Sequence, residues 1–166
     1  MTSTPCRRAI QNELNTFIDQ IDKKSIEEAA DLILEAKANK NRLHFAGIGK
    51  PSYVAGYAAS LISSTGTPAY VLDGTEAVHG SSGQLVPGDV VVCISNSGET
   101  AELLATAHAI ENNGAKLIAI TSNPESTLAK MAQVHIQAKV AEEGGPLNRA
   151  PRASILAELL VVQALS

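Results

Sequence analysis

The chain has 166 residues, a length typical of one domain with a sizeable buried core. Apolar residues make up 45% of it and charged residues 18%, which excludes a disordered chain. Thirteen basic against seventeen acidic residues give a net charge of -4, which argues against nucleic acid or an anionic membrane surface as partner. Three tyrosines, two phenylalanines and no tryptophan also leave few platforms on which bases could stack.

The two cysteines are too few for a disulfide framework. Cys93 lies in an apolar run that predicts a buried strand, and a free thiol in the core is typical of a reducing compartment. No apolar stretch follows the first eight residues as in a signal peptide, and none approaches the roughly 18 residues of a membrane span. The sequence therefore predicts a cytoplasmic protein.

Two helices are predicted before the first strand. Residues 6–22 place their apolar side chains at helical spacing. A second helix is expected to begin at Ser25, where Glu28 completes a capping box. We predict that residues 1–42 form an N-terminal helical hairpin that packs on the rest of the chain or on a partner subunit.

From residue 43 onward, short apolar runs alternate with helical stretches. This alternation is typical of the doubly wound α/β class, in which helices cover both faces of a parallel sheet. Residues 43–166 are therefore expected to form one α/β domain. The predicted strands cover residues 43–46, 69–72, 90–95, 117–121 and 134–137, and the predicted helices cover about 53–64, 101–113, 126–132 and 153–165.

Ligands of doubly wound proteins bind beyond the carboxyl ends of the strands, where the strand order reverses. Hydroxyls, glycines and helix starts gather there in residues 47–52, 95–100 and 121–123. Glycine lets the backbone approach a phosphate, and hydroxyls and helix N-termini donate hydrogen bonds to it. Each loop alone could be a helix cap or a turn. Three such loops on one edge favour a phosphate site.

The hexapeptide Ser-Asn-Ser-Gly-Glu-Thr at residues 95–100 resembles the phosphosugar-binding signature of the sugar-isomerase (SIS) domain family. Residues 49–50, 64–68, 76–80 and 140–143 resemble the arabinose-5-phosphate isomerase branch of that family. The match runs from about residue 25 to residue 157 and implies a five-stranded parallel sheet between helices. It also implies that the phosphate is held by Ser52, Ser95, Asn96, Ser97, Gly98 and Thr100.

The resemblance implies that the chain interconverts arabinose 5-phosphate and ribulose 5-phosphate through an enediol, with no cofactor and no metal. Glu143 matches the family's glutamate after the last strand and is our first choice as the base, with Glu102 as a second carboxylate. Lys50 would hold the substrate or polarise its carbonyl. His79 matches a histidine associated with a site shared between subunits, and the resemblance implies a homo-oligomer, namely a tetramer. The other three histidines are expected to be structural.

The chain departs from the family pattern in three places. Pro51 follows Lys50 where the family has serine, so Ser52 would have to compensate. Ser81 and Ser82 replace an Asp-Leu pair after His79. Relatives continue into a segment that supplies another catalytic histidine, and many carry paired CBS modules, neither of which these 166 residues contain. The alternative to an isomerase is therefore a non-catalytic phosphosugar-binding domain, or an isomerase domain without its C-terminal catalytic segment.

Overall fold

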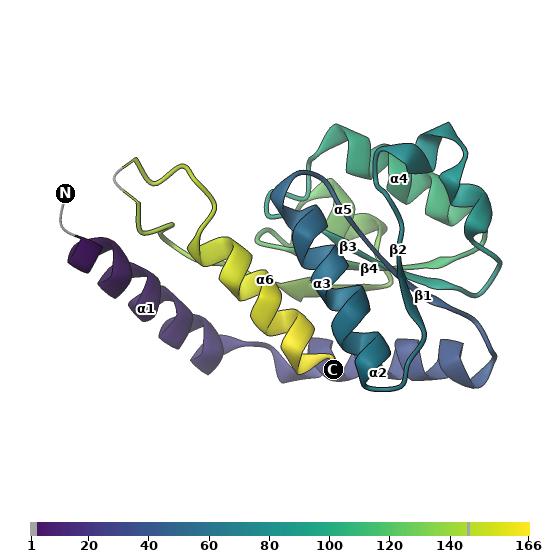
Figure 1. Cartoon of the computed structure of the whole chain (residues 1–166), viewed down its shortest axis with the longest axis horizontal. Coiled ribbons are helices and arrows are strands. Elements are labelled where there is room, and N and C mark those ends of the chain that lie inside the picture. Colours follow the sequence, from purple (N-terminus) through teal and green to yellow (C-terminus); the bar gives the residue numbers. More distant parts are fainter. Residues whose placement is uncertain (1–2, 146) are drawn as a thin grey trace.

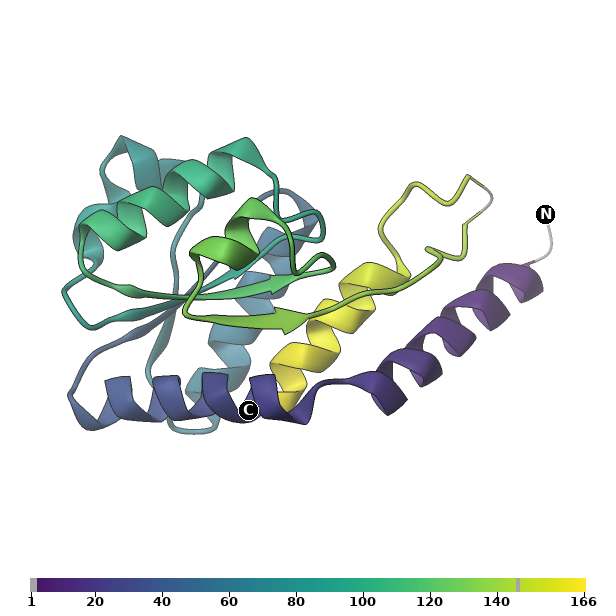
Figure 2. The ribbon, with the colours of Figure 1, turned by 180° about the vertical axis from the view of Figure 1, so that it is seen from behind.

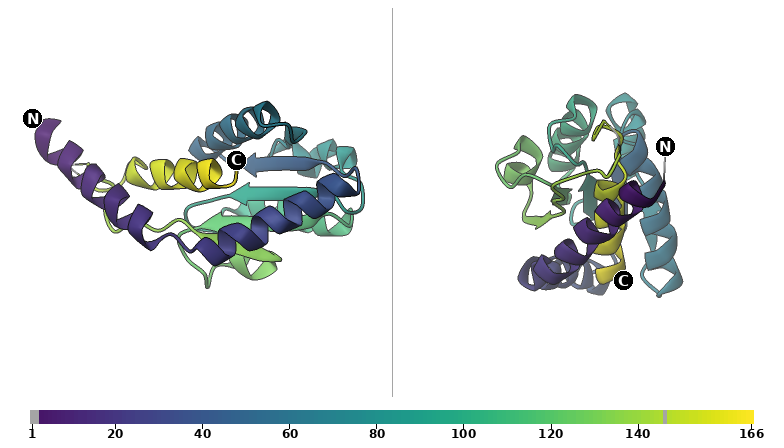
Figure 3. Two further views of the ribbon diagram at one scale, coloured as in Figure 1. Left: turned by 90° about the horizontal axis from the view of Figure 1, so that it is seen from below. Right: turned by 90° about the vertical axis from the view of Figure 1, so that its left-hand side faces the viewer.

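The computed structural model describes residues 3–145 and 147–166, so the first two residues of the predicted N-terminal segment lie outside it. The two predicted N-terminal helices are present as α1 (Ser3–Gln20) and α2 (Lys23–Ala38). They do not fold back on each other: α2 runs along the sheet, whereas α1 extends beyond it and packs on α6 (Ala153–Ala164) (Figures 1 and 3).

The predicted capping box at Ser25 is wrong. The α2 helix begins two residues earlier, because the Asp22 side chain accepts a hydrogen bond from the amide of Lys24 at 3.1 Å and caps the helix. Ser25 instead lies inside the first turn, where its hydroxyl donates to the carbonyl of Asp22 at 2.9 Å. Asp22, three residues before Ser25, is therefore the N-cap residue of α2.

The five predicted strands form one fully parallel sheet in the order β2-β1-β3-β4-β5. This confirms the doubly wound α/β class. The chain moves outward from β1 in both directions, so the strand order reverses between β1 and β3, where ligands of such folds bind. The strands are β1 (Leu43–Gly47), β2 (Ala69–Val71), β3 (Val90–Ile94), β4 (Lys116–Thr121) and β5 (Val134–Gln137).

Helices cover both faces of the sheet (Figure 2). The strand side chains alternate between two hydrophobic cores, one on each face. Phe45 and Val92 face the layer of α2, α3 (Lys50–Ser64) and α6. Ala46 and Cys93 face the layer of α4 (Ala101–Asn112), α5 (Thr127–Met131) and the 3-10 helices η1 (Glu76–His79) and η2 (Ser81–Gln84). Within the described residues, no helix is both long and apolar enough to cross a membrane.

One carboxylate, Asp89, is fully buried at the amino-terminal ends of the strands and joins the segments that precede β1 and β3. It accepts hydrogen bonds from the amides of Arg42 and Val86 at 2.8 and 3.1 Å and from the Arg42 guanidinium at 3.1 Å. Burial alone raises the pKa of Asp89, but these bonds and the Arg42 charge outweigh burial and hold the pKa below its usual value. His44 packs beside it, 3.4 Å away, as the sequence predicted for a structural histidine.

Candidate functional site

A polar cavity of about 250 Å³ lies at the switch point between β1 and β3. Its walls come from the loop after β1, the loop after β3, the loop before α6 and the first two turns of α6. The cavity is smaller than the pockets of drug-sized ligands, so its size suits a small polar metabolite. The lining residues are Ile48, Pro51, Ser95, Asn96, Ser97, Thr100, Glu143, Arg149, Pro151, Ser154, Ile155 and Glu158.

The loop after β3 is folded around Ser95 and Gly98. The Ser95 hydroxyl accepts a hydrogen bond from the amide of Gly98 at 3.1 Å and lies 3.2 Å from the Thr100 hydroxyl. Gly98 has a φ of +67°, and a Cβ there would lie 2.2 Å from the Ser126 hydroxyl, so this position requires glycine. Thr100 precedes α4 without a side-chain cap bond, so first-turn amides of α4 remain available to an anion.

The loop after β4 braces this turn instead of lining the cavity. Ser122 donates from its amide and its hydroxyl to the carbonyl of Asn96, at 2.9 and 2.7 Å. The Glu99 carboxylate accepts from the amide and hydroxyl of Thr127 at 2.7 and 2.8 Å. The predicted loop at residues 121–123 therefore stabilises the turn at residues 95–100, and Glu99 links that turn to α5.

Glu143 lies in the cavity wall, as expected from its position after the last strand. Its Oε2 accepts hydrogen bonds from the amides of Arg152 and Ser154 at 2.6 and 3.1 Å, which ties it to the start of α6. Its own amide donates to the Asn148 side chain at 2.5 Å. Burial raises the pKa of Glu143, but the bonds from Ser154 and Arg152 outweigh that effect and lower it, so the group is ionised at neutral pH.

A second carboxyl, Glu158 on α6, lies in the same wall, and sequence reasoning did not find it. It is 1% exposed, and within the described residues neither of its oxygens has a hydrogen-bond partner. Burial, reinforced by the nearby Glu143 charge, raises the pKa of Glu158 to about 8. The available signal was a glutamate within the apolar run of the last predicted helix, on the face that the sheet buries.

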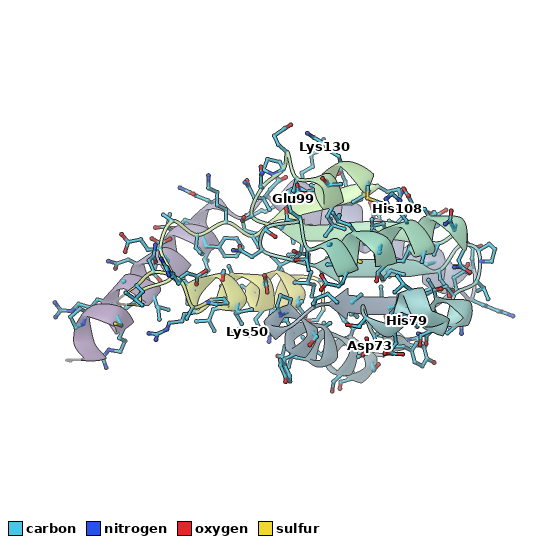
Figure 4. The ribbon with its side chains drawn as sticks, turned by 90° about the horizontal axis from the view of Figure 1, so that it is seen from above. Lys50, Asp73, His79, Glu99, His108 and Lys130 are labelled. Atoms are coloured by element: carbon cyan, nitrogen blue, oxygen red, sulfur yellow. The ribbon has the colours of Figure 1, made fainter. Side chains whose placement is uncertain are left out.

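Lys50 lies outside this cavity, in an adjacent groove of about 610 Å³ between α3 and α6. The groove is lined mainly by apolar side chains, including Tyr53 and Leu159, and shares Pro151 and Ile155 with the cavity. Lys50 therefore lies in a groove that adjoins the cavity. Figure 4 shows it beside the junction of α3 and α6, well apart from His79.

Four other predicted site residues do not line the cavity: Gly98, which shapes the turn after β3, and His79, Glu102 and Ser52. His79 ends η1 and is exposed, and Glu102 is exposed in the first turn of α4. The Ser52 hydroxyl donates to the carbonyl of Gly49 at 2.6 Å, while Pro51 occupies the wall. Across residues 3–145 and 147–166, no three His, Cys, Asp or Glu side chains converge as metal ligands would. The donors around the cavity are hydroxyls, amides and Arg149, a set that suits a phosphate.

A hydroxyl- and glycine-rich turn at the switch point of a doubly wound sheet, beside two carboxyls, is the arrangement expected in α/β proteins that bind small phosphorylated ligands. The comparison with protein families specifies the class further: the SIS domain model matches residues 37–166, so the chain belongs to the SIS domain family.

The chain is similar to curated arabinose 5-phosphate isomerases. It is 41% identical to KdsD of Pseudomonas aeruginosa over 139 residues, covering 84% of this chain and 42% of the relative. It is 36% identical to KdsD of Escherichia coli K12 over 158 residues, covering 95% of this chain and 47% of the relative. The chain thus spans about half the length of these relatives.

Solved structures show the same fold. An E. coli protein in complex with A5P has a TM-score of 0.79 at 34% identity, covering 99% of this chain and 89% of that one. A putative phosphosugar isomerase involved in capsule formation from Bacteroides fragilis has a TM-score of 0.86 at 30% identity, covering 99% and 88%.

Proposed function

We propose that this chain is an aldose–ketose isomerase of sugar phosphates that acts on arabinose 5-phosphate and ribulose 5-phosphate. The observation that carries this proposal is the ionised Glu143 carboxylate in the same small cavity as the hydroxyl turn at residues 95–100. The similarity to arabinose 5-phosphate isomerases, and to a structure in complex with A5P, supports the choice of substrate.

The substrate phosphate would be bound by the turn after β3. Ser97 and Thr100 line the cavity, and the first-turn amides of α4 add donors and a favourable dipole. Ser95 and Gly98 would act mainly through the shape of the turn, because their polar groups bond to each other. Arg149 also lines the cavity and would add a positive charge there.

The reaction moves a proton between two adjacent carbons, which requires a base close to the bound sugar. Glu143 would take the C2 proton of the aldose to form an enediol and return it to C1 to give the ketose. Its hydrogen bonds to α6 hold the carboxylate in place for this transfer. Lys50 would act from the adjacent groove on the open end of the sugar, and Glu102 from the start of α4.

His79 would contribute to a neighbouring subunit's site in a homo-oligomer, proposed to be a tetramer. It is exposed on η1 and does not line the cavity of its own chain. The groove between α3 and α6 exposes Tyr53 to 80%, an apolar surface that a partner subunit would cover. The free thiols Cys6 and Cys93 agree with a cytoplasmic location. Light scattering at micromolar protein tests the assembly, and a monomeric mass would contradict it.

The placement of Lys50 and His79 supports one alternative, a phosphosugar-binding domain that does not turn its ligand over. Both residues lie outside the cavity of their own chain. Among the described residues, the acid–base side chains that line the cavity are therefore Glu143 and Glu158. In that case binding would persist without proton transfer.

The two functions are separated by incubating the protein with arabinose 5-phosphate in deuterated water and following the sugar by proton NMR. The isomerase predicts ribulose 5-phosphate and loss of the C2 proton signal. Shifted or broadened sugar signals without exchange would favour the binding domain. An unperturbed sugar would contradict both.

A further inference from the structure

Glu158 has an environment that folding alone does not explain. Its carboxyl is buried on α6. Among the described residues, it is the one buried carboxyl group that has no hydrogen-bond partner. Leaving a buried polar group unpaired destabilises a fold, so such groups are rare in native proteins. A ligand that enters the adjoining cavity would supply the missing partner.

Glu158 lines the same cavity as the turn proposed to bind the phosphate. It lies one helical turn after Ser154, and both residues line the cavity together with Ser95 and Thr100. Because a phosphate bound at residues 95–100 occupies that end, the sugar would extend along the wall that carries Glu143 and Glu158. Two carboxyls from different elements, the loop after β5 and α6, would then face the same sugar carbons.

We propose that Glu158 is a second catalytic residue, which carries the oxygen-bound proton of the sugar while Glu143 carries the carbon-bound proton. This assignment rests on the proposed isomerase function. It deepens that function by giving the two carboxyls of one cavity separate roles.

The forward half-reaction is balanced with a neutral Glu158 and an ionised Glu143. Glu143 removes the C2 proton, and the C2–H electron pair becomes the C1–C2 double bond. The carbonyl π pair moves to O1, which takes the proton from Glu158, and the enediol is formed. Glu158 is then ionised and Glu143 protonated.

The second half-reaction restores both groups. Glu158 removes the O2 proton, and the O–H pair forms the C2–O2 double bond. The C1–C2 π pair takes the proton from Glu143 at C1, and the ketose is formed. No electrons leave the substrate, and each carboxyl returns to its starting state.

The surroundings of Glu158 favour these states. Burial, and to a smaller extent the negative charge of Glu143, raises the pKa of Glu158 to about 8. A carboxyl kept neutral by an apolar site can donate a proton or a hydrogen bond at neutral pH. The other elements packed against α6 bring Lys50, Tyr53 and Tyr57 from α3 to the adjacent groove. From α1, Glu13 bonds to the amide of Ala141, and Arg149 faces the cavity from the preceding loop.

The test compares wild type, Glu158→Gln and Glu143→Gln, with Glu28→Gln on the exposed face of α2 as the matched control. Each protein is given arabinose 5-phosphate in deuterated water, and two rates are measured by NMR: appearance of ribulose 5-phosphate and deuterium incorporation at the carbon next to the carbonyl. Circular dichroism checks that each variant is folded. Glu158→Met serves as a second variant if the amide prevents folding.

We expect Glu158→Gln to lower kcat at least 100-fold with little change in KM, within the range that general acid–base groups supply. Deuterium incorporation should fall less, so that its ratio to isomerisation rises at least tenfold, because Glu143 still exchanges the carbon-bound proton. Glu143→Gln should lose both rates together, and Glu28→Gln should match wild type. The kcat of wild type should also decline above pH 8, where Glu158 ionises.

Unchanged turnover in a folded Glu158→Gln protein would overturn the proposal, and so would a parallel loss of both rates. Either result leaves the proposed isomerase function intact. If wild type itself neither isomerises nor exchanges the sugar, the isomerase function fails and the Glu158 proposal fails with it.

Discussion

A carboxyl group is buried at each end of the strands, and the two groups differ in the hydrogen-bond donors around them. At the amino-terminal edge, Asp89 is surrounded by donors from its own chain, including the amide and guanidinium of Arg42. At the carboxyl-terminal edge, Glu158 is equally buried, but the described residues offer it no donor. The pKa is lowered at Asp89 and raised to about 8 at Glu158.

This difference is the basis on which we propose a structural role for Asp89 and a catalytic role for Glu158. Asp89 links the segment before β1 to the turn before β3, and every bond it accepts comes from groups ordered by folding. Glu158 lines a cavity and has no partner among the described residues, so a ligand in that cavity could supply one. Burial alone therefore does not identify a site residue, whereas a buried carboxyl without partners beside a cavity is a candidate for one.

The largest effect is expected from Asp89→Ala, which should lower the free energy of unfolding by about 3–5 kcal/mol. Removing Asp89 leaves the buried amides of Arg42 and Val86 without an acceptor and the guanidinium without its partner. Urea unfolding measures the change. Asp31→Ala, on the exposed face of α2, is the control and should stay within about 0.5 kcal/mol of wild type. Equal stability of the two variants would remove the structural role of Asp89.

The opposite sign is expected from Glu158→Met. Methionine fills a similar volume without a polar group, so the free energy of unfolding at pH 7 should rise by about 1–3 kcal/mol, the penalty of an unsatisfied buried group. Turnover should be lost in the same protein. Thermal unfolding and the arabinose 5-phosphate assay measure the two effects. A variant that is less stable than wild type would mean that Glu158 has a structural partner.

A smaller set of contacts is tested by Ser97→Ala in the turn after β3. Because Ser97 lines the cavity and is exposed, the loss of its hydroxyl should weaken phosphosugar binding by about 1–3 kcal/mol. The free energy of unfolding should change much less, because the bond that the hydroxyl accepts from the amide of Glu99 is exposed to solvent. Calorimetric titration with arabinose 5-phosphate measures the affinity. Ser60→Ala, exposed on α3, is the control. Equal affinities for the two variants would show that the phosphate is bound elsewhere.

The smallest change in the free energy of unfolding, counted per pH unit, is expected from the titration of Glu158. A pKa raised to about 8 means that folded Glu158 keeps its proton between pH 4.5 and 8, whereas the unfolded chain has released it. Stability should therefore fall with rising pH in this window, by at most about 1.4 kcal/mol per pH unit. Glu158→Gln should lack this decline. Asp89 and Glu143, with lowered pKa values, should instead lose their contributions as the pH falls below their usual range. Parallel curves for wild type and Glu158→Gln would contradict the raised pKa.

Much of the fold could be predicted because buried parallel strands are continuous apolar runs. All five predicted strands are present, and each limit lies within one residue of the predicted one. The start of α3 was missed: the helix begins at Lys50 instead of residue 53, because Pro51 is tolerated in the first turn of a helix. How α1 and α2 sit relative to each other depends on long-range packing against α6 and the sheet, which periodicity does not record.

The candidate site was predictable where chemistry lies in loops at strand ends. The turn at residues 95–100 and Glu143 were found in this way, and both line the cavity. Glu158 was missed because it lies in the middle of a helix, where a glutamate in an apolar run is the only signal. Ser52 could not be judged, because the direction of its hydroxyl toward Gly49 depends on the backbone at the start of α3.

Carbon-13 NMR titration of the glutamate carboxyls tests the central claim most directly, because it reports the protonation of Glu158 and Glu143 without requiring turnover. Wild type and Glu158→Gln are titrated from pH 3 to 10. We predict one carboxyl resonance in wild type that titrates near pH 8 and is missing from Glu158→Gln, while the resonance missing from Glu143→Gln titrates below the usual range for glutamate. If every glutamate of wild type titrates in the ordinary acidic range, the cavity does not contain one neutral and one ionised carboxyl, and the division of roles between them is wrong.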